Sequence, residues 1–251
     1  MFKATLLTLV TFLSFGSSVR LPIKGTRKSA KDSEPGPRLQ FADCYDYTQG
    51  QGASLHVSDY IPILRNYGWD NMISSCCFTG IWVLYGEENY NRATSNGAVW
   101  WAFGINNCID VPNQFSNIAS SIRFTGAPDD YLYDTLNLYF EEYFSGDEEF
   151  MYTDMPLLNY DNRAKSLIVT GCSPWTLYQY DNYAGLSMCV FPGSTTECTP
   201  GYYQTSQALG SLAGQVSSAR KGCFAQEKVL PVNHGFKVES NGTSGLFIPN
   251  L

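Results

Sequence analysis

The sequence contains very few residues suited to acid–base catalysis. Only two histidines occur: His56 lies in the alternating segment SLHVSDY, and His234 lies in a tail between proline and glycine. Neither belongs to a triad motif, and the GxSxG, HExxH and phosphate-loop patterns do not occur in the chain. A general base must lie within hydrogen-bond reach of the proton it removes. We therefore expect ordinary surface histidines and no enzyme activity.

Positive charge and long apolar runs are also scarce. The chain has 16 Lys and Arg residues against 23 Asp and Glu residues, a formal net charge of −7. A nucleic-acid partner would require a basic face, so we expect none, whereas an acidic surface is compatible with attracting cations. After the N-terminal segment no stretch reaches the roughly 18 apolar residues that a membrane-spanning helix needs. We expect no membrane span.

The N-terminus has the pattern of a secretory signal. Lys3 precedes an apolar run from Ala4 to Phe15, and small residues follow it. This predicts a signal peptide over residues 1–18, because the run is too short to cross a bilayer. The protein is therefore expected to be secreted and extracellular. Residues 19–40 are predicted to be a disordered arm or a removable pro-segment. Their basic pair Arg27-Lys28 is a processing site, a polyanion-binding patch or, as we favour, part of a solvated tail.

Eight cysteines in a secreted chain favour disulfide bonds over metal ligation. Because neighbours on a strand point to opposite faces, Cys76 and Cys77 are expected to have different partners. In the second half of the chain we favour Cys189 with Cys198, across a hairpin, and Cys172 with Cys223, although each set of four allows three pairings. The even division into two sets suggests two separately cross-linked domains: Cys44, Cys76, Cys77 and Cys108, then Cys172, Cys189, Cys198 and Cys223.

From Phe41 onward the chain repeats one design four times. Each unit opens with an aromatic residue followed seven positions later by glycine, except that Arg92 replaces the glycine of the second unit. A hairpin folded back over its own sheet needs a positive φ at its bend, which glycine adopts without steric cost. The second hairpin is therefore expected to bend differently. The four openings are YDYTQGQG from Tyr45, YGEENYNR from Tyr85, YFEEYFSG from Tyr139 and YQYDNYAG from Tyr178.

A second repeated element is a short segment that ends in serine. Its four copies are DNMISS (70–75), SNIASS (116–121), DNRAKS (161–166) and AGQVSS (213–218).

The spacing of the units divides them into two pairs. Their leading tyrosines are 40, 54 and 39 residues apart, so the long middle interval marks a domain boundary. One unit has the size of a Greek key, and two units pack as antiparallel sheets around a shared core. The predicted fold is all-β, with domain 1 at 41–125 (motifs 41–79 and 80–125), a linker at 126–137, domain 2 at 138–223 (motifs 138–171 and 172–223) and a C-terminal tail at 224–251.

The paired hairpins and serine-bearing segments resemble those of the βγ-crystallins. Trp82 and Trp175 stand where a tryptophan opens the even-numbered motifs of that family. The resemblance covers roughly residues 41–223. It implies two βγ-crystallin-like domains, each a sandwich of two Greek-key motifs, and leaves both termini unexplained.

The resemblance also implies calcium binding. The family's signature is two Asn or Asp residues, two variable residues, Ser or Thr, and then Ser. The first position of one motif and the fifth position of its partner supply side-chain oxygens, and backbone carbonyls and water complete the shell. Ligation by oxygen alone suits Ca²⁺. Carried onto this chain, it predicts one intact site from Asp70 with Ser120 and another from Asp161 with Ser217.

The other two combinations are eroded. Ser116 with Ser74 gives a weaker second site in the first domain, whereas Ala213 with Lys165 lacks both ligands and adds a cation. We expect binding at the weak end of calcium sites, about 10⁻⁴–10⁻³ M. The alternative is that the last serine of each signature simply hydrogen-bonds the folded hairpin and that Asp-Asn is an ordinary turn pair.

Two further features bear on function. The acidic pairs Glu87-Glu88 and Glu141-Glu142 lie in hairpins and either strengthen a local negative field or, as we favour, are solvated turn residues. Asn241 begins a single sequon, which predicts N-glycosylation.

Two functions remain open from the sequence. The first, which we favour, is a calcium-binding structural or extracellular-matrix protein, whose partners are calcium ions and a matrix, mineral or another secreted protein. The second is a secreted effector, such as a toxin, defence protein or protease inhibitor, that uses the same scaffold to bind a partner.

Overall fold

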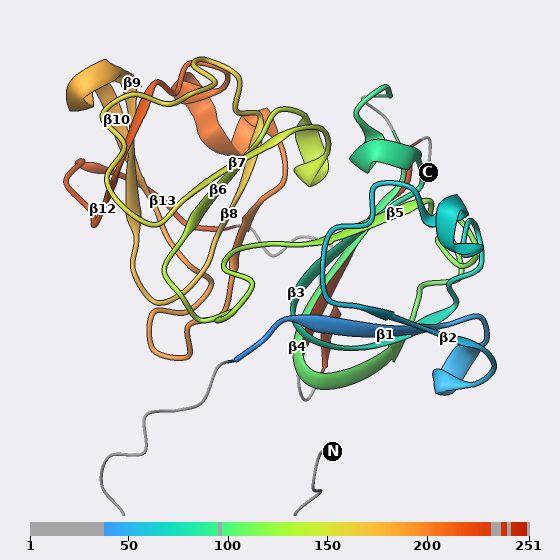
Figure 1. The fold of residues 1–251 in the computed structure, drawn as a ribbon. Coiled ribbons are helices and arrows are strands. Elements are labelled where there is room, and N and C mark those ends of the chain that lie inside the picture. Colours follow the sequence, from blue (N-terminus) through green and yellow to red (C-terminus); the bar gives the residue numbers. More distant parts are fainter. Residues whose placement is uncertain (1–37, 95–96, 232–236, 240–241, 250–251) are drawn as a thin grey trace, which may run out of the picture. The chain divides into compact units, whose positions relative to one another are not determined.

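The computed structural model describes residues 38–94, 97–231, 237–239 and 242–249. The predicted signal peptide, most of the predicted arm, His234 and Asn241 lie outside these residues. Regular structure in the described part consists of β-strands and short 3₁₀ turns (Figure 1), which confirms the predicted all-β class. No helix in the described ranges is long and apolar enough to cross a membrane.

The first half of the fold, residues 38–125, is built on one long hairpin. Strands β3 (Ser75–Tyr85) and β4 (Val99–Asp110) pair along their length, with a register shift between Phe78 and Gly80. Before the shift β3 also pairs with β1, and after it with β5, so one hairpin takes part in both pairings. The remaining elements are β1 (Phe41–Tyr45), β2 (Ser54–Val57) and β5 (Ser121–Phe124), with turns η1 (Thr48–Gly50), η2 (Leu64–Tyr67) and η3 (Glu88–Asn91).

The second half, residues 126–231, contains two four-stranded sheets, ordered β11-β8-β6-β7 and β12-β9-β10-β13. The first sheet comprises β6 (Leu136–Tyr139), β7 (Glu148–Met151), β8 (Ser166–Val169) and β11 (Gly201–Tyr203). The second comprises β9 (Trp175–Tyr180), β10 (Ala184–Val190), β12 (Ser218–Lys221) and β13 (Glu227–Val229). The turns are η4 (Glu142–Phe144), η5 (Asp181–Tyr183) and η6 (Ser206–Leu212).

Each half has its own apolar core. Trp82 and Trp100 are fully buried in the first, and Trp175 is fully buried in the second. Burial of side chains of this size stabilises a fold by about 1.5–3 kcal/mol or more each. A third cluster, rich in aromatic rings, takes residues from both halves, including Trp101 and Phe144, whose rings meet edge to face at 5.2 Å.

A buried ion pair accompanies this mixed cluster. Arg123 of β5 is 2% exposed and donates to the backbone oxygens of Phe144 (2.8 Å) and Gly146 (3.1 Å) in the second half. It also donates to the Tyr85 hydroxyl (2.8 Å), and the carboxylate of Glu148 lies 4.0 Å away. A buried charge needs such partners, because an uncompensated one is costly. Arg123 therefore ties the first half to the second.

The four disulfides correct our favoured pairing. The bonds are Cys44–Cys76, Cys77–Cys108, Cys172–Cys198 and Cys189–Cys223. Cys76 and Cys77 do have different partners, as predicted, and each set of four pairs within itself. The proposed Cys189–Cys198 and Cys172–Cys223 bonds are wrong, because the chain leaves β10 for β11, which belongs to the other sheet of the second half. Cys198 thereby reaches the end of β8, near Cys172, while Cys189 stays in the sheet of β9 and β12.

The segments outside the predicted motifs take part in the fold. Gln40, assigned to the arm, is 2% exposed and donates to the carbonyls of Thr125 and Ala127. β13 extends the sheet of β10 in parallel, and β15 (Gly242–Phe247) pairs with β14 (Lys237–Glu239) and with β4. The C-terminal strand therefore adds to the sheet of the first half. β6 begins at Leu136, inside the predicted linker.

Candidate functional site

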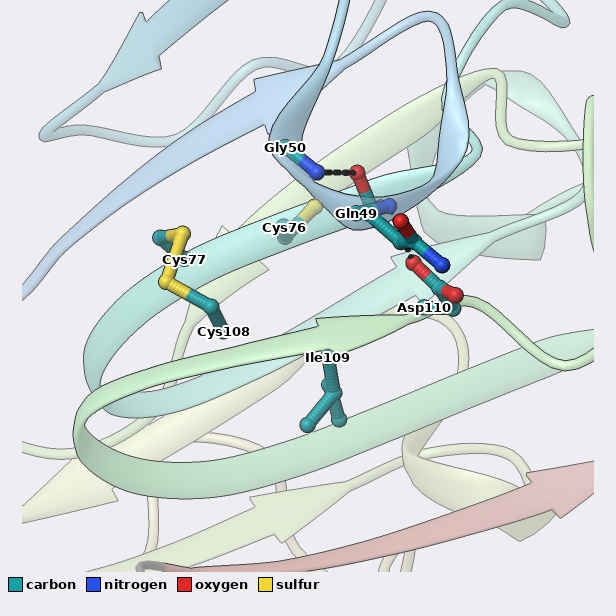
Figure 2. Close-up of a pocket in the computed structure, with 8 residues that line it drawn as sticks. Gln49, Gly50, Cys76, Cys77, Cys108, Ile109 and Asp110 are labelled. Atoms are coloured by element: carbon teal, nitrogen blue, oxygen red, sulfur yellow. Dashed lines mark hydrogen bonds between the residues drawn. A yellow bond between two sulfur atoms is a disulfide. The ribbon is translucent and has the colours of Figure 1, made fainter.

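All four hairpins are fastened by the last serine of the signature. Each serine hydroxyl donates a hydrogen bond of 2.6–2.7 Å to the backbone carbonyl two positions after the leading tyrosine. The same hydroxyl accepts a hydrogen bond of 3.0–3.1 Å from the backbone amide five positions after that tyrosine. In the first case the Gly50 amide donates to Ser75, and the dashed line at Gly50 in Figure 2 marks this bond. The structural role considered for this serine is thus present in every unit. The four sets are Ser75 with Tyr47 and Gly50, Ser121 with Glu87 and Tyr90, Ser166 with Glu141 and Phe144, and Ser218 with Tyr180 and Tyr183.

The hairpin bends follow the expected conformations. Gly52, Gly146 and Gly185 have φ values of 87°, 77° and 80°. Arg92 has φ −59° instead, and Asn91 before it adopts φ 59°. The prediction that the second hairpin bends differently is therefore confirmed.

The signature segments of paired motifs lie against each other reciprocally. The amide at the second signature position donates to a carbonyl of the partner segment at 2.9–3.0 Å, and this residue is left-handed in all four motifs, with φ of 58–63°. Asparagine tolerates this conformation and glycine adopts it freely. Gly214 is therefore a conformational equivalent of asparagine. The four bonds run from Asn71 to Ala119, Asn117 to Ile73, Asn162 to Val216 and Gly214 to Ala164.

This pairing brings the first predicted ligand pair together. The Ser120 hydroxyl donates to Asp70 Oδ1 at 2.7 Å. The other oxygen of Asp70 accepts from Arg65 Nε (3.2 Å) and Nη2 (3.1 Å). Nη1 of the same guanidinium lies 3.1 Å from Glu88 Oε1. Arg65 had no predicted role and Glu88 was predicted to be a solvated turn residue, but in the structure Arg65 contacts both Asp70 and Glu88.

Glu88, on the other side of Arg65 from Asp70, has a carboxylate oxygen that lacks a hydrogen-bond donor. Its Oε1 atom is buried and makes no hydrogen bond, although Arg65 is within ion-pair distance. A buried oxygen without a hydrogen bond is unusual in a folded protein. A carboxylate oxygen is a ligand of the kind that a hard cation such as Ca²⁺ prefers.

The weaker predicted pair of the first half is made of hydroxyl and amide groups. Ser116 donates to the Ser74 hydroxyl at 3.3 Å, and Ser74 donates to Asn117 Oδ1 at 3.0 Å. No carboxylate takes part in these two bonds. The site is accordingly poorer in charge than that of Asp70.

In the second half, no hydrogen bond joins the side chains of Asp161 and Ser217 in the described structure. Ser217 donates to the Gln179 carbonyl at 2.8 Å and to Asn162 Oδ1 at 3.4 Å. Asp161 accepts from the Asn162 side-chain amide at 2.9 Å. Asn162 thus links the two predicted ligands.

The fourth combination holds a protein cation, as its sequence indicated. Lys165 Nζ donates to Glu141 Oε2 at 2.7 Å in the neighbouring hairpin. Ala213 offers no oxygen side chain.

No group of three or more His, Cys, Asp or Glu side chains is gathered as a metal cluster in the part of the chain that the structure describes. The candidate sites instead combine carboxylates with hydroxyl and amide oxygens. This donor set fits Ca²⁺ and excludes metals that select thiolate or imidazole.

A surface pocket of about 420 Å³ lies beside the first hairpin and was not anticipated (Figure 2). The Cys77–Cys108 disulfide lines it, and Asp110 on its wall accepts the Gln49 amide at 2.6 Å. His56, outside the pocket, is exposed and lies 2.7 Å from Asp43. Neither place combines a nucleophile with a base.

The architecture is that of the βγ-crystallins. Geodin, a βγ-crystallin from Geodia cydonium, matches 73% of this chain and 99% of its own, with 21% identity and a TM-score of 0.56. A βγ-crystallin from an archaeon matches 35% of this chain and 96% of its own, at 23% identity and a TM-score of 0.30, and one from Ciona intestinalis matches 35% and 98%, at 20% and 0.29.

The predicted resemblance is confirmed at the level of the fold, on the strength of the geodin match. No protein-family model matches the sequence. No curated protein matches it either.

Proposed function

We propose that this chain is a secreted, calcium-binding βγ-crystallin-like protein with a structural or extracellular-matrix role. The observation that carries the proposal is the 2.7 Å contact between Asp70 and Ser120, which come from different motifs and stand at the two ligand positions of the signature. Glu88 adds a second carboxylate, because its Oε1 makes no hydrogen bond and lies 3.1 Å from the same Arg65 guanidinium that contacts Asp70. Asp161 and Ser217 would hold a second ion in the other half. The proposed domains are 41–125 and 138–223, and the sheets of the second half extend beyond the latter range, from Leu136 at the start of β6 to Val229 at the end of β13.

A bound ion would act through stability. It would link two signature segments that are distant in sequence and would neutralise carboxylates. An ion present at 100 times its Kd stabilises the folded state by about 2.7 kcal/mol. Together with four disulfides, this suits a protein that persists outside cells.

Calorimetric titration of the secreted protein tests calcium binding. We expect binding at about 10⁻⁴–10⁻³ M and the loss of one ion each in Asp70→Ala and Asp161→Ala. Asp154→Ala is the matched control, because Asp154 is exposed and pairs with Arg220 outside the signature segments. The absence of binding heat at millimolar calcium would refute the proposal.

Expression of the full chain tests secretion. The protein should appear in the medium, start near residue 19, and lose mass on treatment with an N-glycosidase unless Asn241 is replaced by Gln.

A further inference from the structure

We infer that the side chain of Arg65 competes with calcium for the carboxylates of the Asp70–Ser120 site. Calcium therefore fills the Asp161–Ser217 site first. This inference rests on the proposed function and reverses the order expected from the signature alone. The signature is complete at residues 70–75, whereas Lys165 interrupts it in 161–166. What sets the order is a residue outside the signature.

The guanidinium of Arg65 contacts both carboxylates of the first site. Its Nε and Nη2 donate to Asp70 Oδ2 at 3.2 and 3.1 Å, and its Nη1 lies 3.1 Å from Glu88 Oε1. A calcium ion that used these oxygens would have to displace the guanidinium, because both cations need the same lone pairs. A guanidinium stays charged at every physiological pH, so the competitor is always a cation.

Local chain length explains why only one half has this cation. The Leu64 amide donates to the carbonyl of Ser120, and the Leu158 amide donates to the carbonyl of Ser217. Because Ser120 and Ser217 are at the same signature position, Leu64 and Leu158 are at equivalent places in the two halves. Five residues separate Leu64 from Asp70, but only two separate Leu158 from Asp161. The first connection is thus three residues longer. It contains the rest of the turn η2 (Leu64–Tyr67), including Arg65.

The second half keeps its corresponding carboxylates free of protein cations. Asp181 occupies the place in its hairpin that Glu88 has in the second hairpin, three residues after the leading tyrosine. Within the described residues, no Lys, Arg or His forms an ion pair with Asp161 or Asp181. Calcium meets no competitor there.

Arg65 is 68% exposed, so its competition is moderate and reversible. Exposed ion pairs are weak and screened by salt. We expect Arg65→Gln to tighten calcium binding at the first site by about three- to tenfold, on the scale of two such pairs.

Calorimetric titration in an Asp161→Ala background isolates the first site. Arg65→Gln should tighten binding there, and adding Asp70→Asn should abolish the gain. Arg92→Gln is the matched control: Arg92 is 67% exposed, lies in the hairpin of Glu88, and pairs with Asp147 instead of a site carboxylate. It should change the affinity less than twofold.

The outcomes separate the two proposals. If the unmodified chain binds calcium but Arg65→Gln binds no tighter than its Asp161→Ala parent, or if Arg92→Gln tightens binding equally, the Arg65 inference is wrong and the calcium proposal stands. If neither the unmodified chain nor Arg65→Gln binds at millimolar calcium, the proposed function fails and the inference fails with it.

Discussion

Replacing Arg123 by methionine should strongly destabilise the protein. Methionine keeps the apolar stem but removes three hydrogen bonds, to Tyr85 Oη, Phe144 O and Gly146 O. It also leaves Glu148, whose side chain is 5% exposed, without its cationic neighbour. Removing one partner of a buried pair costs about 3–5 kcal/mol, because the remaining charge stays desolvated. We expect a loss of that size in the free energy of unfolding.

Urea unfolding followed by tryptophan fluorescence measures this loss. The matched control is Arg92→Met, which removes an ion pair with Asp147 across the same two halves, but one whose arginine is 67% exposed. Its cost should stay below about 1 kcal/mol.

Adding Glu148→Leu to Arg123→Met should recover only part of the loss. It removes the buried charge that Arg123 no longer balances, but the Tyr60 and Tyr139 hydroxyls then lose their acceptor. The prediction is wrong if Arg123→Met lowers the free energy of unfolding no more than Arg92→Met does. It is also wrong if Glu148→Leu is as destabilising in the Arg123→Met background as it is in the unmodified protein.

Three further predictions concern other parts of the fold. Desolvation raises the pKa of Tyr85 and Tyr139, and that of Tyr90 to about 12, whereas unfolded tyrosines ionise near pH 10, so stability should fall as the pH rises from about 10 to 12. Absorbance at 295 nm should show these tyrosines ionising together with unfolding; ionisation in a folded protein near pH 10 would contradict this. Cys44→Ala with Cys76→Ala should cost about 3–4 kcal/mol in urea unfolding, because the bond joins residues 32 apart, and an unchanged midpoint would count against it. Gly245→Val should detach β15, since a Cβ there would lie 2.3 Å from the Trp101 ring, and hydrogen exchange should show protection lost in residues 242–247 but kept in β9.

The repeating pattern was sufficient to predict the fold, because it reports local requirements that each unit must meet by itself. A tyrosine hairpin needs a left-handed bend and a serine to fasten it, and both are visible in the sequence. The same logic has a limit at Gly214. Gly214 replaces the asparagine of the signature in the fourth motif, yet its backbone does what asparagine does in the other three motifs.

What the sequence could not provide depends on contacts between distant segments. Cys189 and Cys198 are close in sequence but belong to parts of the chain that enter different sheets. Arg65 lies in a connection that is three residues longer than its counterpart in the second half, and nothing local shows that its side chain reaches Asp70 and Glu88. The C-terminal strand carries no crystallin pattern, and its partner β4 ends more than 100 residues earlier.

The place of β15 has a consequence for how the chain folds during synthesis. β4 is complete at Asp110, but the strand that covers its edge begins at Gly242, roughly 130 residues later. At about 5–20 residues per second, the ribosome needs on the order of ten seconds to supply it. During that interval the first half exposes an unpaired strand edge, the kind of surface through which chains aggregate. A strand made about 130 residues after β4 thus completes the sheet of the first half, and a chain truncated before Gly242 would leave this edge of β4 unpaired.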